Sequence, residues 1–184
     1  MLNKLILSLA AVCIIATPAM AEDVKKPAAN FAVVDVQLIL TESVAAKNIQ
    51  KQLQTKRDAL QKEFVQHEEK LRADEKALAA EKGKLDEAAF KAKRDEFEKK
   101  LMETQGLVQK KKRDLEQAVL DSTGVLREAL LKITAEIADE KKFDVVLNRQ
   151  TVVIADKSLD ITQAVLDKLN AKLTEVPLKA KKAD

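Results

Sequence analysis

The segment FDVVLNRQTVVIAD, from Phe143 to Asp156, decides how the rest of the chain must fold. It holds two short runs rich in valine and isoleucine, residue types that favour strands, and the polar residues between them favour a tight turn. The sequence therefore predicts a β-hairpin with strands at 144–148 and 151–155. Because an isolated two-stranded hairpin is marginal in water, this hairpin needs another strand or a partner surface.

The one earlier strand-like run is FAVVDV, residues 31–36, and we expect it to join the hairpin in one small sheet. Asp35 can cap the short helix VQLILTES that follows. After the hairpin, SLDITQAVLDKLNAKL predicts a helix in which Asp160 and Gln163 have the spacing of a capping box. The predicted buried face of that helix consists of Ile161, Val165, Leu166, Leu169 and Leu173.

These strands and the C-terminal helix form a predicted base made of residues 22–40 and 142–176. Three strands and one helix leave sheet edges open, and exposed edges must be covered or paired. We therefore expect subunits to associate through the base. The residues assigned to this oligomerisation surface are Val33, Val34, Val36, Val145, Leu147, Val152 and Ile154.

Residues 41–141 contain no proline, and their apolar residues recur every seven positions, the period of a coiled-coil seam. The outgoing rows are Phe64, Leu71, Leu78 and Leu85, and Ala46, Leu53 and Leu60, the second continuing at the polar His67 and Asp74. The returning rows are Phe90 and Phe97, and Leu101, Val108 and Leu115. A four-residue shift, a stutter, then leads to Val119, Leu126 and Ile133.

The heptad pattern is interrupted at AEKGKLDEAAF. Gly83 suits the left-handed residue that ends a helix, and Asp86 suits the N-cap of the next helix. We predict two antiparallel helices of ~60 Å with a tip near 82–87. Leu60 would then face Lys110, with paired residue numbers adding to about 170. One unbroken helix is the alternative. The predicted fold class is α+β: a small β-sheet oligomerisation base, a long antiparallel α-helical coiled-coil hairpin and a C-terminal helix.

The N-terminus has the three parts of a secretory signal peptide, namely Lys4, the apolar run 5–16 and the small residues before Glu22. A membrane anchor is the alternative, but the run is shorter than the ~20 apolar residues that span a bilayer. We expect residues 1–21 to be cleaved after Ala21 and the mature protein to lie in the bacterial periplasm. The one cysteine, Cys13, falls inside this signal. Residues 177–184, PLKAKKAD, are expected to form a flexible basic tail.

The residue inventory of the predicted mature chain argues against catalysis. It has one histidine, His67, no cysteine, and no Walker phosphate loop. Metal sites usually need several His, Cys or clustered carboxylates, and a catalytic triad needs partners that a coil seam rarely offers. We expect no enzyme activity, no metal and no cofactor. His67 and Asp74 either loosen the outer seam, so that the arm tips can splay, or tilt toward solvent.

Basic residues are concentrated in two places on the predicted arm, although the mature chain is nearly neutral, with 32 basic and 30 acidic residues. They are candidates for attracting acidic unfolded proteins or anionic lipid headgroups, the alternative being an ordinary solvated face. Met102 and Leu107 are candidates for apolar client contact, the alternative being packing between the helices. The basic candidates are Lys56, Arg57, Lys62, Lys110, Lys111, Lys112 and Arg113, and, near the tip, Lys82, Lys84, Lys91, Lys93 and Arg94.

FAVVDVQLIL and FDVVLNRQTVVIADKSLDITQAVLDKL, with the charged helical stretch between them, resemble the OmpH/Skp family of periplasmic chaperones. The sharpest part of the resemblance is the pattern of Asp160 to Leu166. The resemblance implies a homotrimer whose helical arms surround a cavity. It further implies an ATP-independent holdase that binds unfolded outer-membrane proteins and prevents their aggregation.

Three other functions remain as alternatives on sequence grounds. A structural coiled-coil spacer or tether in the periplasm would explain the helices equally well. Nucleic-acid binding, suggested by the basic run at Lys110 to Arg113, conflicts with the signal peptide and the lack of aromatic stacking residues, so no specific nucleic acid is expected. Weak contact with a membrane surface is a possible side activity, although the chain lacks the tryptophans of interfacial helices.

Overall fold

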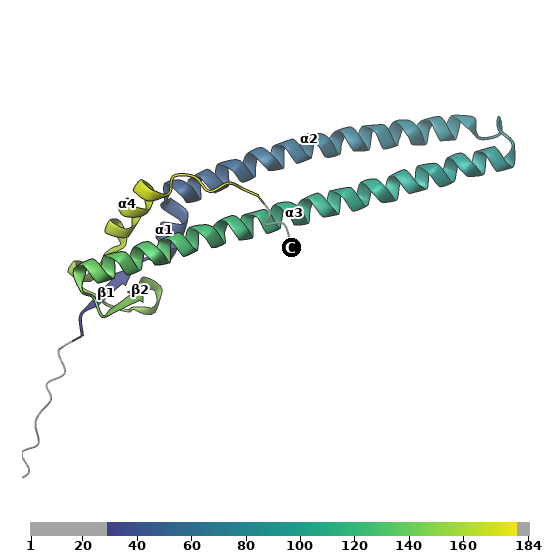
Figure 1. Ribbon diagram of the computed structural model, residues 1–184. Coiled ribbons are helices and arrows are strands. Elements are labelled where there is room, and N and C mark those ends of the chain that lie inside the picture. The colour runs from purple at the N-terminus through teal and green to yellow at the C-terminus, as the bar shows by residue number, and fades with distance from the viewer. Residues whose placement is uncertain (1–28, 180–184) are drawn as a thin grey trace, which may run out of the picture.

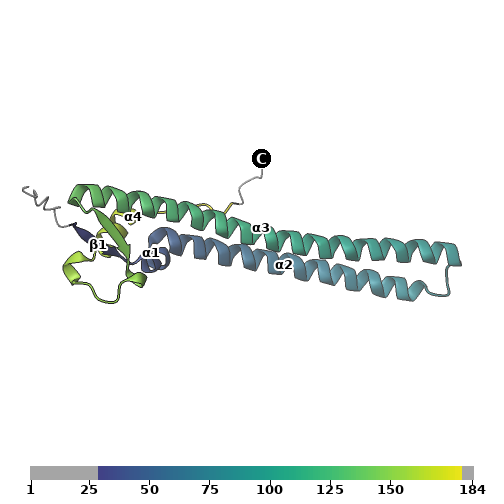
Figure 2. The same ribbon diagram turned by 90° about the horizontal axis from the view of Figure 1, so that it is seen from below.

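The protein, described here by a computed structural model over residues 29–179, has a small base from which two long helices project (Figures 1 and 2). The predicted combination of long helices and a small sheet is confirmed. In chain order the elements are β1 (Phe31–Val34), α1 (Val36–Glu42), α2 (Val44–Glu81), α3 (Glu87–Lys141), β2 (Val145–Asn148), the 3₁₀ turns η1 (Arg149–Thr151) and η2 (Lys157–Leu159), and α4 (Thr162–Lys172).

The two long helices form an arm, because the chain reverses after α2 and α3 runs back beside it (Figures 1 and 2). Gly83 has a φ of 81°, a left-handed conformation that side chains with a Cβ rarely adopt. Asp86 accepts a hydrogen bond from the Ala89 backbone N–H at 2.8 Å and so caps α3. With 55 residues, α3 is ~80 Å long. It therefore extends past the start of α2 and forms part of the base.

The arm register differs from the prediction by one helical turn. Lysines of α3 reach carboxylates of α2 in the pairs Lys111–Glu63, Lys100–Asp74 and Lys93–Glu81, whose residue numbers each add to 174. Leu60 accordingly shares two surface hollows with Leu115 and is not opposite Lys110. This register brings the apolar rows of the two helices together, which is how a two-helix seam buries most apolar surface.

The sheet of the base has two strands, and they are parallel. Phe31 lies opposite Val145 and Val34 opposite Asn148. The other edge of β1 is occupied by the chain before α4, where the Ile161 N–H donates to the Val33 carbonyl at 2.9 Å. Residues 152–155 are therefore not the predicted third strand.

The predicted β-hairpin at Phe143–Asp156 is wrong because the chain turns away after β2. The side chain of Asn148 accepts from the Gln150 N–H at 3.3 Å, and the Val152 N–H donates to the Arg149 carbonyl at 3.1 Å. These bonds close a 3₁₀ turn instead of the two-residue turn that pairs antiparallel strands.

Two helix starts in the base were predicted, and one is correct. Asp35 caps α1 by accepting from the Leu38 N–H at 2.9 Å. The capping box of Asp160 and Gln163 is absent: α4 begins at Thr162, and the Gln163 side chain bonds Asp167 instead. Thr162 accepts from the Asp35 N–H at 2.8 Å, which ties the start of α4 to the start of α1.

The buried apolar core lies at the base end of the molecule and includes the N-terminal part of α2, the C-terminal part of α3 and the segment after α4. The stutter in the heptad pattern of α3 marks its boundary: before it α3 packs on α2, and after it α3 is also covered by α1 and α4. Of the predicted buried face of α4, Ile161, Val165 and Leu169 are fully buried. The other core residues are Ala32, Val33, Val34, Ile39, Ala45, Ala46, Ile49, Ala118, Leu126, Leu130, Ile133, Ile137, Val176 and Leu178.

The structure bears on one of the two predicted terminal segments, the tail, and not on the signal peptide. The signal peptide, residues 1–21, lies outside the described residues. The tail was expected to be flexible from Pro177, but Leu178 is buried and the backbone is hydrogen-bonded to the arm, so that expectation is wrong as far as Lys179. Pro177 itself follows a buried Val176.

Truncating the core should destabilise the protein far more than truncating the arm seam. Leu126, 1% exposed, packs in the base, whereas Leu71 is half-buried between the helices. We expect Leu126→Ala to lower the free energy of unfolding by about 2–5 kcal/mol and Leu71→Ala by less than half as much. Urea denaturation followed by circular dichroism measures both, and equal losses would contradict a core confined to the base end of the molecule.

Candidate functional site

The arm beyond the base has no fully buried residue. From Gln50 on α2 to Gln117 on α3, every described apolar seam residue is only half-buried or is exposed. The reason is geometric, because each helix has only one neighbouring helix here and its apolar stripe is wider than one helix can cover. The arm therefore presents apolar surface on both sides of its seam.

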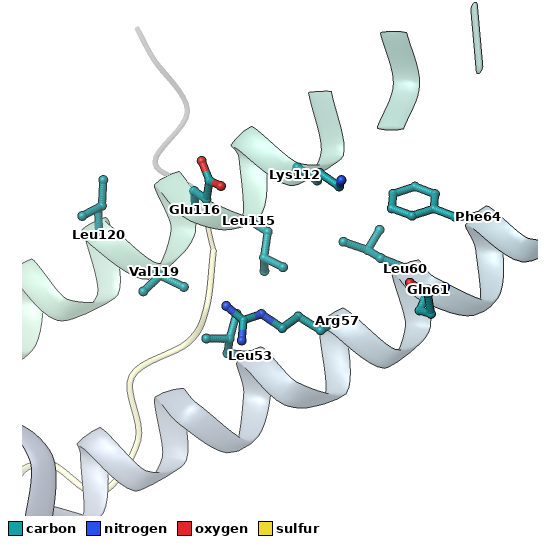
Figure 3. Close-up of a pocket in the computed structure, with 10 residues that line it drawn as sticks. All are labelled: Leu53, Arg57, Leu60, Gln61, Phe64, Lys112, Leu115, Glu116, Val119 and Leu120. Atoms are coloured by element: carbon teal, nitrogen blue, oxygen red, sulfur yellow. The ribbon is translucent and has the colours of Figure 1, made fainter. Parts of the chain in front are cut away.

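One surface hollow, which we call the Arg57 hollow, lies where the arm leaves the base (Figure 3). It has a volume of about 620 Å³. Figure 3 shows Leu115 and Val119 of α3 facing Leu53 and Leu60 of α2, with the Arg57 side chain running along α2 toward Leu53. The complete lining is Leu53, Arg57, Leu60, Gln61, Phe64, Lys112, Leu115, Glu116, Val119 and Leu120.

A second hollow, the Lys56 hollow, shares Leu60 and Leu115 with the first, so these leucines separate the two. Its volume is about 600 Å³. Its other lining residues are Lys56, Ala59, Glu63, Lys111, Asp114, Ala118, Leu178 and Lys179. Both hollows combine an apolar floor with basic side chains at the rim, so they can hold an apolar segment of chain next to acidic groups.

The structure brings together part of the predicted basic cluster of the arm. Lys56 and Lys111 line the Lys56 hollow, while Arg57 and Lys112 line the Arg57 hollow. Lys111 is neutralised by Glu63. Within the described chain, no ion pair is formed by the exposed candidates Lys56, Arg57, Lys62, Lys110, Lys112 and Arg113.

Glu63 has two charged or polar partners, Lys111 across the arm and His67 on its own helix. Lys111 donates to its carboxylate at 2.6 Å, and Nε2 of His67 lies 3.7 Å away. The hydrogen bond from Lys111, more than any other contact, lowers the pKa of Glu63 below its ordinary value of 4.5. The polar His67 at the seam thus has a carboxylate beside it, and the polar Asp74 has Lys100 at 3.3 Å.

Lys100 belongs to a second charge cluster farther along the arm. Its ammonium bonds Glu96 on its own helix and Asp74 on α2, and these hydrogen bonds raise the pKa of Lys100, with Glu96 the larger cause. The seam polar residue Asp74 therefore lies beside a cation of the other helix while its side chain stays partly exposed. Because both residues stay partly solvated, the pair contributes little to the free energy of unfolding.

The basic candidates at the tip are exposed, and some of them form ion pairs while others do not. Lys93 bonds Glu81 at 2.6 Å, and Arg94 lies 3.5 Å from Glu98. Lys82, Lys84 and Lys91 make no ion pair in residues 29–179. The two apolar candidates also differ: Met102 is 67% exposed, whereas Leu107 is half-buried in a hollow with His67 and Leu71.

The predicted association residues of the base fall into two groups. Val33 and Val34 are buried inside the subunit and present no surface to a partner, because β1 lies between β2 and the chain before α4. Val36 and Val152 are half-buried. Val145, Leu147 and Ile154 are exposed, the last by 88%.

Sequence reasoning missed several exposed apolar residues. Val153, next to Ile154, is 98% exposed, and Phe31 on β1 is 45% exposed. The VVI run of 152–154 could have indicated this, since a strand has neighbouring side chains on opposite faces and cannot bury all three. Nothing in the heptad pattern singled out the exposed apolar residues of α3, Leu120, Val125 and Leu131.

Two kinds of site are absent from the part of the chain that the structure describes. Residues 29–179 contain no group of three or more His, Cys, Asp or Glu placed to hold a metal ion. Among the same residues, no helix combines the length and apolar character needed to cross a membrane.

Comparison with known proteins shows similarity to a protein family, to a curated protein and to a solved structure. The sequence matches the family described as "Outer membrane protein (OmpH-like)" over residues 30–169. An uncharacterized protein of Aquifex aeolicus (strain VF5) is 30% identical over 148 residues, which cover 77% of this chain and 86% of that protein. A Caulobacter crescentus CB15 crystal structure, assigned as an OmpH-like outer membrane chaperone, shares the fold with a TM-score of 0.70 at 19% identity, over 86% of this chain and 94% of that one.

The lowered pKa of Glu63 should be measurable directly. Its folded pKa lies below 4.5, so its contribution to arm stability is present above that pH and is lost as the pH falls through the folded pKa. We expect a ¹³C NMR titration of the Glu63 carboxyl to give a pKa below 4.5, and Lys111→Met to raise it. An unchanged pKa in Lys111→Met would contradict the assigned cause; Lys112→Met, on the neighbouring exposed residue, is the matched control.

Proposed function

The chain belongs to the OmpH-like family, and from that premise we propose that it is an ATP-independent holdase chaperone for unfolded outer-membrane proteins. Membership supports a chaperone role in general, and a non-enzymatic role is consistent with it. The observation that carries the proposal is the arm itself, which exposes apolar seam surface over its whole outer length.

The surface of the arm suits weak binding of a disordered chain. An unfolded outer-membrane β-barrel protein offers apolar and polar residues in alternation. The volumes of the Arg57 and Lys56 hollows are similar to those of small-ligand sites. Each hollow has an apolar floor, and flexible lysine or arginine side chains lie at its rim. Such contacts need no fixed register and no nucleotide, so a client can bind in many arrangements and leave again.

We propose that subunits associate through the base into a homotrimer. The outer edge of β2 forms no ladder with any described strand, and Val145, Leu147, Val153 and Ile154 are exposed near it. An apolar surface next to an open strand edge is an association site or an aggregation hazard. Three arms around a common base would enclose a cavity into which the hollows and Met102 could face.

The proposed compartment is the periplasm, reached through cleavage of the signal after Ala21. The basic residues of the arm would then attract acidic clients at long range, and anionic lipid headgroups would compete for the same charges. The candidates without ion pairs, Lys110, Lys112 and Arg113 among them, are the ones whose charge is free to act in this way.

A structural spacer or tether in the periplasm is the rival function. A spacer benefits from a continuous, closed seam, whereas this seam contains His67 and Asp74 and leaves open hollows on both sides. Suppression of client aggregation separates the two functions, because a spacer has no reason to keep an unfolded protein soluble.

The holdase function is tested with a urea-unfolded outer-membrane β-barrel protein diluted into buffer. We expect the mature protein to suppress light scattering without ATP. Reversing the charges of Lys110, Lys112 and Arg113 to glutamate should slow client capture severalfold at low salt and much less at 0.5 M salt.

A control variant with the charges of Lys132 and Lys141 reversed, at exposed residues in the C-terminal part of α3, should capture at the normal rate. Full aggregation in the presence of excess wild-type protein would disprove the holdase function. Capture rates of the arm variant that equal those of the wild type at every salt concentration would disprove the electrostatic part alone.

Association through the base is tested by native mass spectrometry of the mature protein. We expect a trimer, and we expect Val153→Asp combined with Ile154→Asp to dissociate it by placing charges in the interface. Val65→Asp, at an exposed arm position, is the control and should remain trimeric. A monomeric wild type, or a trimer that survives the double substitution, would refute this interface.

A further inference from the structure

The C-terminal segment after α4 lies against the arm (Figures 1 and 3). It leaves the end of α4 and runs in an extended form along α2 and α3, toward the Lys56 hollow. We call residues 176–179 the strap. Its position is unexpected from the sequence, because a proline and a run of lysines favour a solvated tail.

The strap backbone is held by one side chain of the arm. The Gln52 amide donates from Nε2 to the Val176 carbonyl at 2.8 Å, and its Oε1 accepts from the Leu178 N–H at 3.0 Å. A neighbouring β-strand would make the same pair of bonds, on both sides of the intervening residue. Ser122 of α3 adds a third, donating from its hydroxyl to the Pro177 carbonyl at 3.0 Å. All three bonds engage the backbone and therefore do not depend on the strap's side chains.

The side chains of the strap alternate between buried and exposed. Val176 is 2% exposed and Leu178 is 3% exposed, while Pro177 between them faces solvent. This is the period-two pattern of an extended strand with one apolar face. Leu178 and Lys179 line the Lys56 hollow together with Leu60 and Leu115. The groove is thus built to accept an extended chain.

We propose that this groove, formed by Gln52, Ser122 and the Lys56 hollow, is a binding site for extended segments with apolar residues at alternate positions. Its occupant in the working protein is a segment of the unfolded client, and the strap is an intramolecular competitor that covers the site until a client displaces it. The client identity rests on the proposed function, but the site and its strap do not.

The chemistry of the site matches that class of client. Segments that will become transmembrane β-strands carry apolar side chains at every second residue, the pattern of Val176 and Leu178. Backbone recognition by Gln52 and Ser122 tolerates any sequence between those apolar residues. Lys56, Lys111, Glu63 and Asp114 also line the Lys56 hollow, so the site accepts polar residues of either charge.

The strap should weaken client binding by a modest factor. A segment tethered next to its site has an effective concentration on the order of 1 mM. If the free strap sequence binds with a dissociation constant of about 0.1 mM, the tethered strap raises the apparent dissociation constant of a competitor about tenfold. Release of the strap therefore exposes the site without any change to the arm.

The site is tested with a fluorescent peptide of residues 174–184, TEVPLKAKKAD, and fluorescence anisotropy. The full mature chain carrying Val176→Asp and Leu178→Asp has an unoccupied site, and we expect it to bind the peptide about tenfold more tightly than the wild type does. Adding Gln52→Ala to that chain should abolish the gain. Gln50→Ala, at an exposed neighbouring position of α2, is the matched control and should leave the gain intact.

A chain ending after Glu175 provides a second way of opening the site, with a chain ending after Lys179 as its control. Failure of the peptide to bind either opened variant, when both retain wild-type circular dichroism, would overturn the site. If the opened chain binds the peptide equally tightly with and without Gln52→Ala, the proposed role of Gln52 in holding the bound backbone is overturned.

A separate experiment tests whether the client competes with the strap. Opening the site should raise the affinity for a urea-unfolded outer-membrane β-barrel protein severalfold, and unchanged affinity would overturn the client as occupant while the peptide result stands. If the wild type and the opened variants all fail to capture that protein, the proposed function fails, and peptide binding then supports only a groove that holds its own strap.

Discussion

The structure depends on the way a single helix is covered. α3 is continuous over 55 residues, and its C-terminal part is packed by α1, α4 and β2, while its N-terminal part has α2 alone beside it. Leu126 and Leu130 are therefore 1% exposed, whereas the seam leucines farther out are only half-buried. α3 is thus buried in the base at its C-terminal part and half-exposed in the arm at its N-terminal part. Because the helix is continuous, it connects the base to the arm.

The open arm follows from simple geometry. Two helices can bury a narrow stripe between them, and apolar residues at the flanks of that stripe remain in contact with water. Most globular proteins cover such flanks with further elements, which this arm lacks. The exposed flanks are a cost for a spacer but a working surface for a protein that holds unfolded chains, and this is why the same geometry supports the chaperone proposal.

The charged pairs between the two helices all fit the register of the arm, but they add little to its stability. Lys111–Glu63, Lys100–Asp74 and Lys93–Glu81 occur at one common offset, so a slip of the helices would break all three pairs together. Each pair is partly solvated and is worth little by itself. The strap adds a different connection, since Gln52 and Ser122 join the end of the chain to both helices where the arm begins.

Much of the fold was determined by the sequence itself, wherever the cause is local. Helix periodicity, the left-handed Gly83, and the caps at Asp35 and Asp86 depend on residues a few positions apart, so the long helices and their connection follow from pattern. The stutter before Leu126 is also visible in the sequence, but only the structure shows that α3 enters the base there.

The tertiary structure alone decided the features that depend on distant partners. The VVLN and VVI runs have equal strand propensity, yet only the first pairs, because Ile161 occupies the other edge of β1 and a 3₁₀ turn at Asn148 diverts the second. The arm register depends on which apolar layers meet across two helices, and the order of the tail depends on Gln52, more than 120 residues earlier in the chain. Which strand pairs with β1, and where the end of the chain docks, depends on which other segments can occupy the same edge or surface. A local sequence pattern does not contain that information.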